Sequence, residues 1–375
     1  MIEIRKVSDK KGLKKFVRYV NELYKECEQW VPSLEFDEMA TLRKDKNPAF
    51  AHCEAEYWLA YRDGEIVGRI AGIINHKANE KWGNKVRFGW FDFINDVEVA
   101  SALVKTVEEW GKSKGMTGIH GPLGFNDMDK EGLLVEGFDN IPTIATLYNY
   151  PYYMDILEKL GFTKAEDWLQ YKLNLGNKVP DKIVRVHEII SKRYPNLRAV
   201  TFKTKKEIKK YAIPLFHTLN AAFANLYGYS ELTDDEIKVI VGNYFSFIDP
   251  RFVSLVFDEN DNVVAFGISM ASLSTAYQKA KGKLFPFGFI PILKALRKKN
   301  FETIDLYLNG VLPEWQNKGI HALYYTSMNQ AYIDNHIPYA ITNPQLESNI
   351  NAVHIWNNYD IELYNRRRCY TKEID

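Results

Sequence analysis

The sequence has few cysteines, almost no net charge and no long run of apolar residues, and each shortage excludes a class of protein. Its three cysteines are odd in number and far apart, which excludes a disulfide framework and favours a reducing compartment. A formal net charge of +1 gives no overall attraction to nucleic acid. No apolar run approaches the roughly 20 residues that span a bilayer, and the N-terminal MIEIRKV alternates like a strand rather than a signal peptide. We therefore expect a protein of the cytoplasm, or one peripheral at the inner membrane.

Groups that mark several common enzyme classes are missing as well. The eight histidines are scattered without the spacing of metal ligands, so the sequence predicts no metal site. No G-x-S-x-G stretch occurs, and the cysteines show no nucleophile signature. Hydrophobic residues make up 46% of the chain and aromatic residues 14%, which is enough for sizeable cores. A length of 375 residues then indicates two domains or one large one.

The order of the predicted elements occurs twice along the chain. Two hairpin patterns mark it most clearly: residues 57–74 alternate around Asp63-Gly64, and residues 253–270 alternate around a turn at 258–262. In both copies a strand, a helix, a strand and a helix follow the hairpin. We therefore predict a mixed α+β fold of two similar domains, residues 1–177 and 178–375, each with a mixed, mostly antiparallel twisted sheet flanked by helices.

The stretch LYLNGVLPEWQNKGIHALYYTSMNQ (residues 306–330) has the strongest functional pattern. Apolar and polar residues alternate up to Leu308, as in a strand, and Gly310 and Pro313 then end the alternation. A helical apolar face resumes just after Gly319. A strand that feeds directly into a helix start offers free backbone N–H groups at the positive end of a helix dipole. Such a loop suits a pyrophosphate, and Gly319 lets the backbone approach it closely.

This stretch resembles the acyl-CoA-binding motif of the GNAT superfamily of N-acyltransferases, whose usual pattern is Gln/Arg-x-x-Gly-x-Gly/Ala. Gln316 and Gly319 match, and His321 stands where a small residue is usual. The resemblance implies two GNAT-like domains in tandem and an acyl-CoA or acetyl-CoA co-substrate. It implies that the co-substrate is bound by Val311, Leu312, Gln316, Asn317, Lys318, Gly319 and Ile320. The first copy has no Q-x-x-G in FINDVEVASALV (93–104), so we expect it to lack a CoA loop.

A second family pattern, Asn-x-x-Ala-x-x-x-Tyr, follows the next strand. Asn349 and Ala352 match it, and Trp356 stands where tyrosine is usual. The resemblance places Asn349 and Trp356 near the CoA. In many family members that tyrosine protonates the leaving thiolate, which Trp356 cannot do.

The predicted reaction needs a base, because an attacking ammonium must lose its proton. Tyr307 and Asn309 lie where the strand would open beside the thioester, and His321 opens the helix beside the pyrophosphate. Glu347 and Asp305 are the carboxylates weighed as general base, with a surface or capping role as the alternative for Asp305. Backbone amides near 309–311 would polarise the thioester carbonyl.

One segment is unusual for a small GNAT enzyme. Residues 284–293 are nearly all apolar, and they are flanked by basic residues without any acid: Lys279, Lys281, Lys283, Lys294, Arg297, Lys298 and Lys299. About ten apolar residues are too few to cross a bilayer but can lie in its interface. The segment could instead line a tunnel for a long acyl chain, or pack into the core between the two domains.

The sequence thus predicts an N-acyltransferase that moves an acyl group from a thioester to a primary amine. A non-catalytic scaffold or CoA-ester-binding protein is the alternative, because His321 and Trp356 depart from the motifs. The layout also resembles, more loosely, bacterial GNAT-related proteins that N-acylate amino-lipids in sphingolipid synthesis. That resemblance implies long-chain acyl transfer at the membrane surface.

Overall fold

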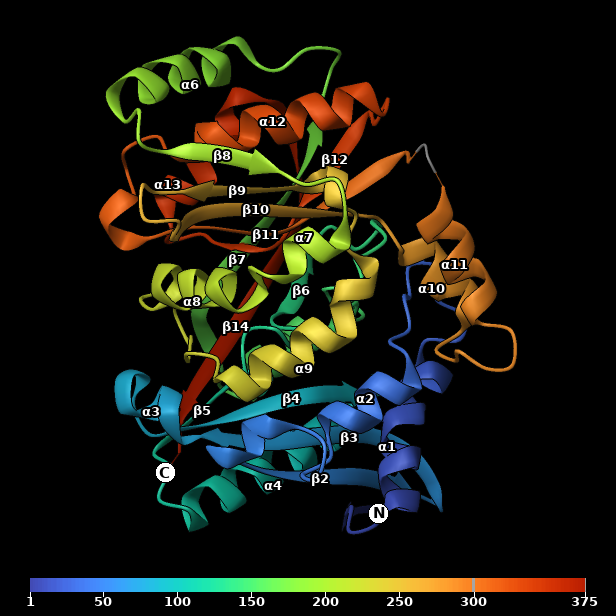
Figure 1. The fold of residues 1–375 in the computed structure, drawn as a ribbon. Helices are drawn as coiled ribbons and strands as arrows, with labels where there is room; N and C mark the ends of the chain where they lie inside the picture. The colour runs from blue at the N-terminus through green and yellow to red at the C-terminus, as the bar shows by residue number, and fades with distance from the viewer. Residues whose placement is uncertain (299–300, 375) are drawn as a thin grey trace.

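The computed structural model describes residues 1–298 and 301–374, so the predicted basic flank at Lys299 lies outside the described residues. One large twisted sheet runs through the molecule, with helices on its faces (Figure 1). Its strands are β1 (Ile2–Lys6), β2 (Cys53–Arg62), β3 (Glu65–Asn75), β4 (Lys85–Phe93), β5 (Gly118–Gly121), β6 (Leu133–Glu136), β7 (Thr163–Asn174), β8 (Arg198–Thr201), β9 (Val253–Phe257), β10 (Val263–Ala271), β11 (Thr303–Val311), β12 (Tyr339–Thr342), β13 (Gln345–Leu346) and β14 (Asp360–Glu373). The helices are α1 (Lys10–Leu23), α2 (Glu35–Thr41), α3 (His76–Trp82), α4 (Val97–Ser113), α5 (Tyr152–Lys159), α6 (Asp181–Arg193), α7 (Lys205–Lys209), α8 (Ala212–Phe223), α9 (Asp234–Tyr244), α10 (Ser274–Ala280), α11 (Phe289–Arg297), α12 (His321–Asp334) and α13 (Ile350–His354).

The two predicted hairpins are confirmed, and with them the mixed α+β class. Strands β2 and β3 pair antiparallel around Asp63 and Gly64, which both have positive φ, as a tight hairpin turn requires. Strands β9 and β10 pair in the same way. In each half the next strand pairs parallel with the strand after the following helix: β4 with β5, and β11 with β12.

The last strand of each half lies in the other half's part of the sheet. The sheet order is β1-β2-β3-β4-β5-β14-β7-β12-β11-β10-β9-β8. Strand β7, from the first half, pairs with β12, β13 and β14 of the second half. Strand β14 pairs with β5, β6 and β7 of the first half. In Figure 1 these two strands cross the middle of the molecule between the two groups of strands.

Two local features of the fold follow from particular hydrogen bonds. The short strand β6 gains its hydrogen bonds from β14, which is distant in the sequence. The helical region that begins at Lys205 is broken into α7 and α8 at Lys210-Tyr211. Thr204 caps α7 through a capping box with Glu207, so α7 begins independently of α8.

Each half carries a bulge at the same place in its sheet. One extra residue enters β4 opposite the Arg69–Ala71 part of β3, and Trp90 takes a positive φ there. In the second half the extra residue in β11 is Tyr307, between the pairs Ile268–Leu308 and Ser269–Leu306. A bulge turns a side chain and leaves one backbone group outside the ladder. The two bulges face the region between the halves, where both contribute to one cavity.

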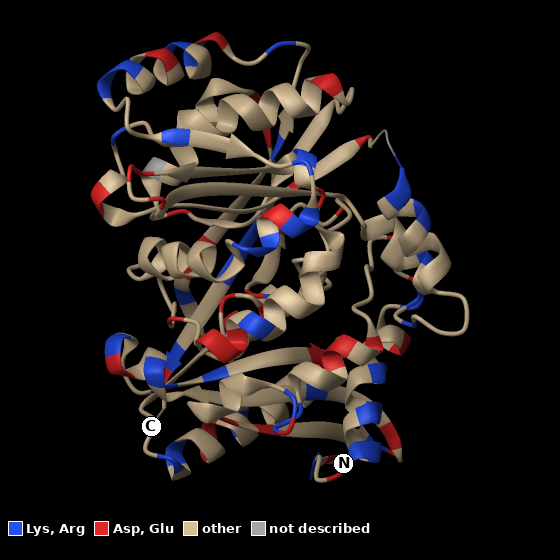
Figure 2. Cartoon of the chain, viewed as in Figure 1, with Lys and Arg blue, Asp and Glu red and all other residues tan. Residues whose placement is uncertain are grey.

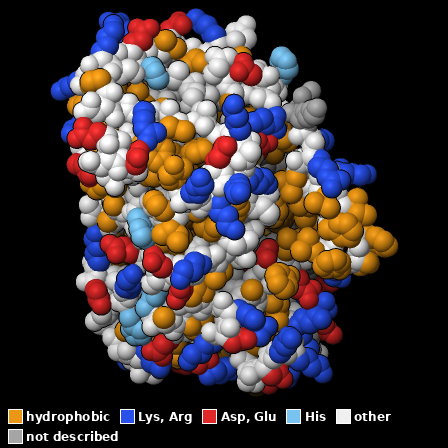
Figure 3. Space-filling view, viewed as in Figure 1, with side chains coloured by type: hydrophobic (Ala, Val, Ile, Leu, Met, Phe, Trp, Pro, Cys, Tyr) orange, Lys and Arg blue, Asp and Glu red, His pale blue; other side chains and the backbone are white. Residues whose placement is uncertain are grey.

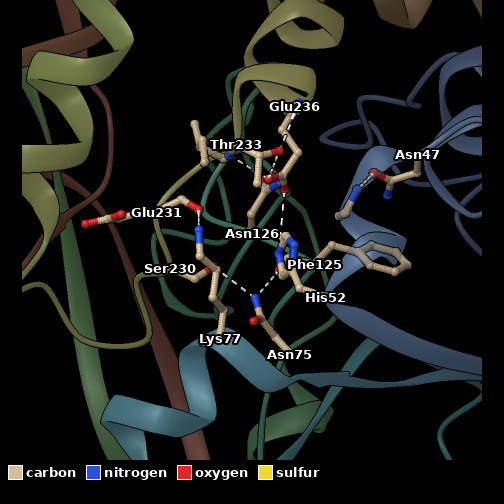
Figure 4. Close-up of polar contacts among 12 residues, drawn as sticks. Asn47, His52, Asn75, Lys77, Phe125, Asn126, Ser230, Glu231, Thr233 and Glu236 are labelled. Carbon is tan, nitrogen blue, oxygen red and sulfur yellow. Dashed lines mark hydrogen bonds and ion pairs between the residues drawn. The ribbon is translucent and has the colours of Figure 1, made fainter.

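A buried polar cluster ties the two halves together on the α9 side (Figure 4). Asn75 of β3 donates from Nδ2 to the Phe125 carbonyl and to Ser230 Oγ, both at 2.9 Å. Asn126 Nδ2 donates to Glu236 Oε1 of α9 at 2.9 Å. Glu236 also completes the capping box of α9 with Thr233. Helix α9 is therefore held in place by groups from the first half.

Candidate active site

The loop in which the sequence predicted a phosphate-binding turn leads from β11 directly to the start of α12. Asn317 and Gly319 have positive φ, and Gln316, Asn317 and Lys318 are exposed. No described residue accepts a hydrogen bond from the backbone N–H groups of Lys318, Gly319, Ile320 or His321, and no side chain caps α12. Unpaired amides at the start of a long helix favour an anion.

The equivalent helix start in the first half is already filled by an acid. Asp96 caps α4 by accepting from Glu98 N at 2.8 Å, and it forms an ion pair with Arg62 at 2.6 Å. The side-chain hydrogen bond from Arg62 lowers the pKa of Asp96, which keeps its carboxylate charged. A phosphate would meet this negative charge. The lack of a CoA loop in the first copy stays a prediction.

Gly319 has a second role that the sequence did not indicate. A Cβ at this position would lie 3.1 Å from Val186 and 3.3 Å from Ile190, both on α6. Helix α6 packs along α12 and covers that side of the loop. A larger side chain at 319 would therefore disturb helix packing as well as any bound phosphate.

Of the other residues predicted to bind the co-substrate, some are exposed on the surface and others pack in the core. Gln316 Nε2 donates to the Val311 carbonyl at 3.0 Å, which closes the loop on itself. Lys318 Nζ lies 5.1 Å from the centre of the Trp315 ring and is otherwise open to solvent. Burial lowers the pKa of His321, which keeps its imidazole neutral at physiological pH. Val311, Leu312 and Ile320 pack in the core beneath α12.

Tyr307 and Asn309 lie on opposite faces of β11. Asn309 pairs with Gly267, whose missing Cβ would touch Met328 and Tyr324 of α12, so Asn309 lies on the same face of the sheet as α12. Tyr307 instead lies 6.2 Å, ring centre to ring centre, from Tyr244 of α9. Burial raises the pKa of Tyr307 to about 12, so it keeps its proton and can donate a hydrogen bond. Parallel pairing with β12 ends at Leu306–Thr342, which leaves the β12-facing edge of β11 open beyond that point.

The carboxylates weighed as base have different surroundings from those expected. Glu347 forms ion pairs with Lys164 at 2.8 Å and Arg366 at 2.7 Å, which lower its pKa and make it a weaker base than the role requires. Asp305 is neither a surface nor a capping residue: it is 6% exposed, and burial raises its pKa to about 7.

Asn349 and Trp356 have structural contacts. Asn349 caps α13 by accepting from Ala352 N at 3.4 Å. Trp356 is fully buried, and its indole N–H donates to Gln345 Oε1 at 2.6 Å. Its ring meets Tyr325 of α12 edge to face, at 5.6 Å between ring centres. Trp356 therefore stabilises the packing of α12, and its polar N–H group does not point to the open edge of β11.

A large cavity between the halves was not predicted from the sequence. Both bulges line it, through Trp90 and Tyr307, and its walls include residues of α1, α2, β4 and the loops after β5 and β6. Acidic and hydroxyl groups gather along it: Asp37, Glu38, Asp129, Tyr244, Tyr277 and Tyr307. Glu38 is held by the Trp90 indole N–H, and Asp129 Oδ2 accepts from Phe125 N at 2.7 Å.

Two acids of this cavity have raised pKa values, as a general base requires. Burial raises the pKa of Asp129 to about 7 and that of Asp37 to about 6. Charge repulsion from nearby Glu38 is a smaller cause that contributes to both of these pKa values. A base with a pKa near physiological pH is both available and strong enough to take a proton from an ammonium. The sequence signal for Asp129 is the acid-rich stretch NDMDKE (126–131), which lies between β5 and β6.

A second cavity adjoins the first across Tyr244 and Tyr307, which line both. It lies among α7, α8, α9 and the strands β10 and β11, and its exposed surface is entirely apolar. Its lining includes Leu215, Phe216, Ile240, Val241, Ile268, Met270 and Leu308. Apart from the two tyrosines its lining residues are apolar, so this cavity suits a hydrocarbon chain.

Among residues 1–298 and 301–374, no group of three or more His, Cys, Asp or Glu side chains is arranged to hold a metal ion. In the same residues no helix is long and apolar enough to cross a membrane.

Comparisons with known proteins agree with the fold. No family model matches the chain. The chain is 27% identical over 376 residues to Protein YghO of Escherichia coli, covering 99% of this chain and 95% of that protein. It is 26% identical over 378 residues to the bacterial ceramide synthase of Caulobacter vibrioides, covering 96% and 95%.

Solved structures extend the comparison. The tandem GNAT protein from the clavulanic acid biosynthesis pathway aligns with a TM-score of 0.57 at 13% identity, over 100% of this chain and 99% of that one. A GCN5-related N-acetyltransferase from Sphaerobacter thermophilus aligns with a TM-score of 0.50 at 11% identity, over 100% and 96%. The predicted tandem arrangement of two GNAT-like halves is confirmed.

Proposed function

We propose, from its tandem GNAT fold, that this protein is an acyl-CoA-dependent N-acyltransferase that acts on a primary amine. The observation that carries the proposal is the cavity at the two bulges, where carboxyl groups with raised pKa values line the same cavity as Tyr307 of β11. The edge of β11 that faces β12 is open beyond Leu306. Acyl transfer to an amine needs these two features together. Backbone N–H groups at the open edge of β11 would polarise the thioester carbonyl, and a carboxylate would take the proton of the attacking nitrogen.

In the proposed mechanism, the unpaired amides at 318–321 hold the pyrophosphate of the acyl-CoA, and Asn317 and Gly319 shape that turn. The thioester lies at the open edge of β11, where backbone N–H groups near 309–311 stabilise the oxyanion. The acceptor ammonium enters the large cavity and gives a proton to Asp129. Its nitrogen attacks the carbonyl carbon, and the C–S bond then breaks. The nitrogen loses its second proton, the CoA sulfur takes up one proton, and the products are the amide and free CoA thiol.

The apolar cavity and the C. vibrioides relative support a long acyl chain and an amino-lipid acceptor. A ceramide is an N-acylated amino-lipid, and the chain is similar to a bacterial ceramide synthase over 96% of its length. The apolar cavity shares Tyr244 and Tyr307 with the large cavity, and most of its other lining residues are aliphatic or aromatic. In the proposal the acyl chain occupies this cavity, and the amine lies on the other side of the two tyrosines.

Filling the apolar cavity should change chain-length preference. We expect Val241→Phe, which lines the cavity, to lower kcat/KM for long-chain acyl-CoA by about tenfold or more, because overpacking an apolar site excludes methylene groups. Activity with acetyl-CoA should change little. The matched control is Val239→Phe on the same helix, since Val239 is 41% exposed. Equal loss for all chain lengths would contradict the assignment.

Reversing the charge at Lys318 should weaken CoA binding. Lys318 is exposed and has no acidic partner among the described residues, so Lys318→Glu changes the charge beside the unpaired amides without removing core packing. We expect the Kd of CoA to rise about three- to tenfold at low salt and less at high salt. Calorimetry can measure this against Lys159→Glu, an exposed lysine on α5. Equal affinity in both variants would place the pyrophosphate elsewhere.

A non-catalytic CoA-ester-binding protein is the second candidate. The neutral, partly buried His321 and the buried Trp356 depart from the family pattern and favour it. The two candidates are separated by measuring free thiol released from a long-chain acyl-CoA, with and without a long-chain amine. Amine-dependent release supports the enzyme, whereas tight acyl-CoA binding without release supports the binding protein.

A further inference from the structure

A helical hairpin projects from the body of the molecule beside the large cavity. Helices α10 and α11 lie together at the right of Figure 1, joined by the loop 281–288. In Figure 3 the same projection is the main apolar area of the visible surface, with basic side chains above it. Phe285 is 77% exposed and Phe287 is 72% exposed, and Ile290 and Leu293 continue the apolar surface along α11.

The base of the hairpin packs against the first half of the chain. The position of its exposed tip is therefore fixed by the fold. Leu273, Tyr277 and Ile292 pack in a buried cluster with Val31 and Leu34 from the first half. The carbonyl of Gly282 accepts from Glu35 N at 2.8 Å, and a Cβ at Gly282 would lie only 3.1 Å from the Ser33 carbonyl oxygen. The predicted burial of residues 284–293 between the domains is therefore wrong for the tip and holds only for its inner face.

All charged side chains in the described part of the hairpin are basic. The described residues from 274 to 298 include no acid, and their basic side chains are all exposed and form no ion pair with a described residue: Lys279, Lys281, Lys283, Lys294, Arg297 and Lys298. Figure 2 shows this concentration of basic residues on the hairpin. Exposed aromatic side chains beside unpaired cations match a surface that is apolar inside and anionic outside.

We propose that the α10–α11 hairpin docks the protein onto the surface of an anionic lipid bilayer, with Phe285 and Phe287 inserted between the acyl chains. The proposal deepens the proposed function and rests on it for the identity of the acceptor. Leu34, Ile144 and Tyr277 pack at the base of the hairpin and also line the large cavity. Docking through the tip therefore brings a lipid-embedded amine to the entrance of that cavity without full transfer into water.

The test is flotation of the full chain with vesicles that contain phosphatidylglycerol, at low and high salt, without substrate. We expect the wild type to float. Phe285→Ser with Phe287→Ser should weaken binding at least about tenfold at both salt concentrations, because it removes inserted apolar area. Lys294→Glu with Arg297→Glu and Lys298→Glu should weaken binding at least about tenfold at low salt and much less at high salt. The control Ile189→Ser with Val97→Ser removes exposed apolar residues far from the hairpin and should float like the wild type.

Two outcomes would overturn the proposal. The first is a wild type that stays at the bottom of the gradient at low salt. The second is a Phe285→Ser, Phe287→Ser variant that changes from dimer to monomer in sedimentation without any change in vesicle binding, which would assign the surface to a second copy of the chain. Acyl transfer to a water-soluble amine is measured separately. Transfer without flotation would refute the docking surface alone, and flotation without any transfer would refute the proposed function alone.

Discussion

Replacing Asp129 by Asn should lower kcat by about a hundredfold or more, because a positioned general base contributes about 10²–10⁴-fold to such a reaction. The asparagine has the same shape, and its side-chain oxygen can still accept from Phe125 N, as the Asp129 carboxylate does at 2.7 Å. The change therefore removes the proton acceptor and keeps the contact that positions it. Binding of acyl-CoA should stay close to that of the wild type, because the CoA loop lies on α12.

The pH profile gives a second readout. Burial raises the pKa of Asp129 to about 7, so its base form is present above that pH and is lost below it. The kcat/KM of the wild type should rise through about pH 7 and then level off, and this limb should be absent from Asp129→Asn.

The stability of the folded protein should change with pH in the opposite direction from its activity. A carboxyl group whose pKa is raised by folding stabilises the folded state only while it is protonated, so its contribution is lost as the pH rises through about 7. At pH values above this, Asp129→Asn should unfold at a temperature equal to or higher than the wild type.

Asp127→Asn is the matched control for both measurements. Asp127 lies two residues away, and burial also raises its pKa to about 7, but its side chain does not line the cavity. We expect this variant to keep wild-type kcat. If Asp127→Asn and Asp129→Asn lose activity equally, the loss comes from the loop and not from a base, and the proposed mechanism is wrong.

The sequence predicted the parts of the site that depend on local pattern. The loop from Gln316 to His321 could be proposed as a phosphate site because positive φ and a helix start leave a signature within a few residues. The sequence did not point to Asp129 as the proposed base, because its pKa is raised by burial among distant segments and nothing in NDMDKE shows which acid will be buried. Glu347 was weighed from its distance to the motif, whereas its partners Lys164 and Arg366 are remote in sequence.

In the fold, too, the local features were predictable and the contacts between distant segments were not. Hairpins and amphipathic helices were predictable, because their periodicity is local. The exchange of β7 and β14 was not, because these strands find their partners through pairing that a linear pattern does not encode. The repeat divides the chain at residues 177 and 178, but the hydrogen bonds of the sheet do not divide there.

Expressing residues 1–177 and 178–375 as separate chains should therefore give no folded protein from either one. Strand β7 has all its strand partners in the second half, and β14 has all its partners in the first. Alone, the first chain would expose both edges of β7 and the buried side chains Trp168, Leu169 and Leu173. Total stabilities of about 5–15 kcal/mol cannot absorb such losses.

Co-expression of the two chains should restore a soluble complex, because every strand pair is then available. The control is the same break made after folding, at a protease site placed in the exposed turn 176–178 of the full chain. That nicked protein should keep its melting temperature and its CoA affinity. Cooperative unfolding and CoA binding by residues 178–375 alone would show that the second half folds without β7, and that the exchanged strands are an addition to two independent domains rather than the feature that unites them.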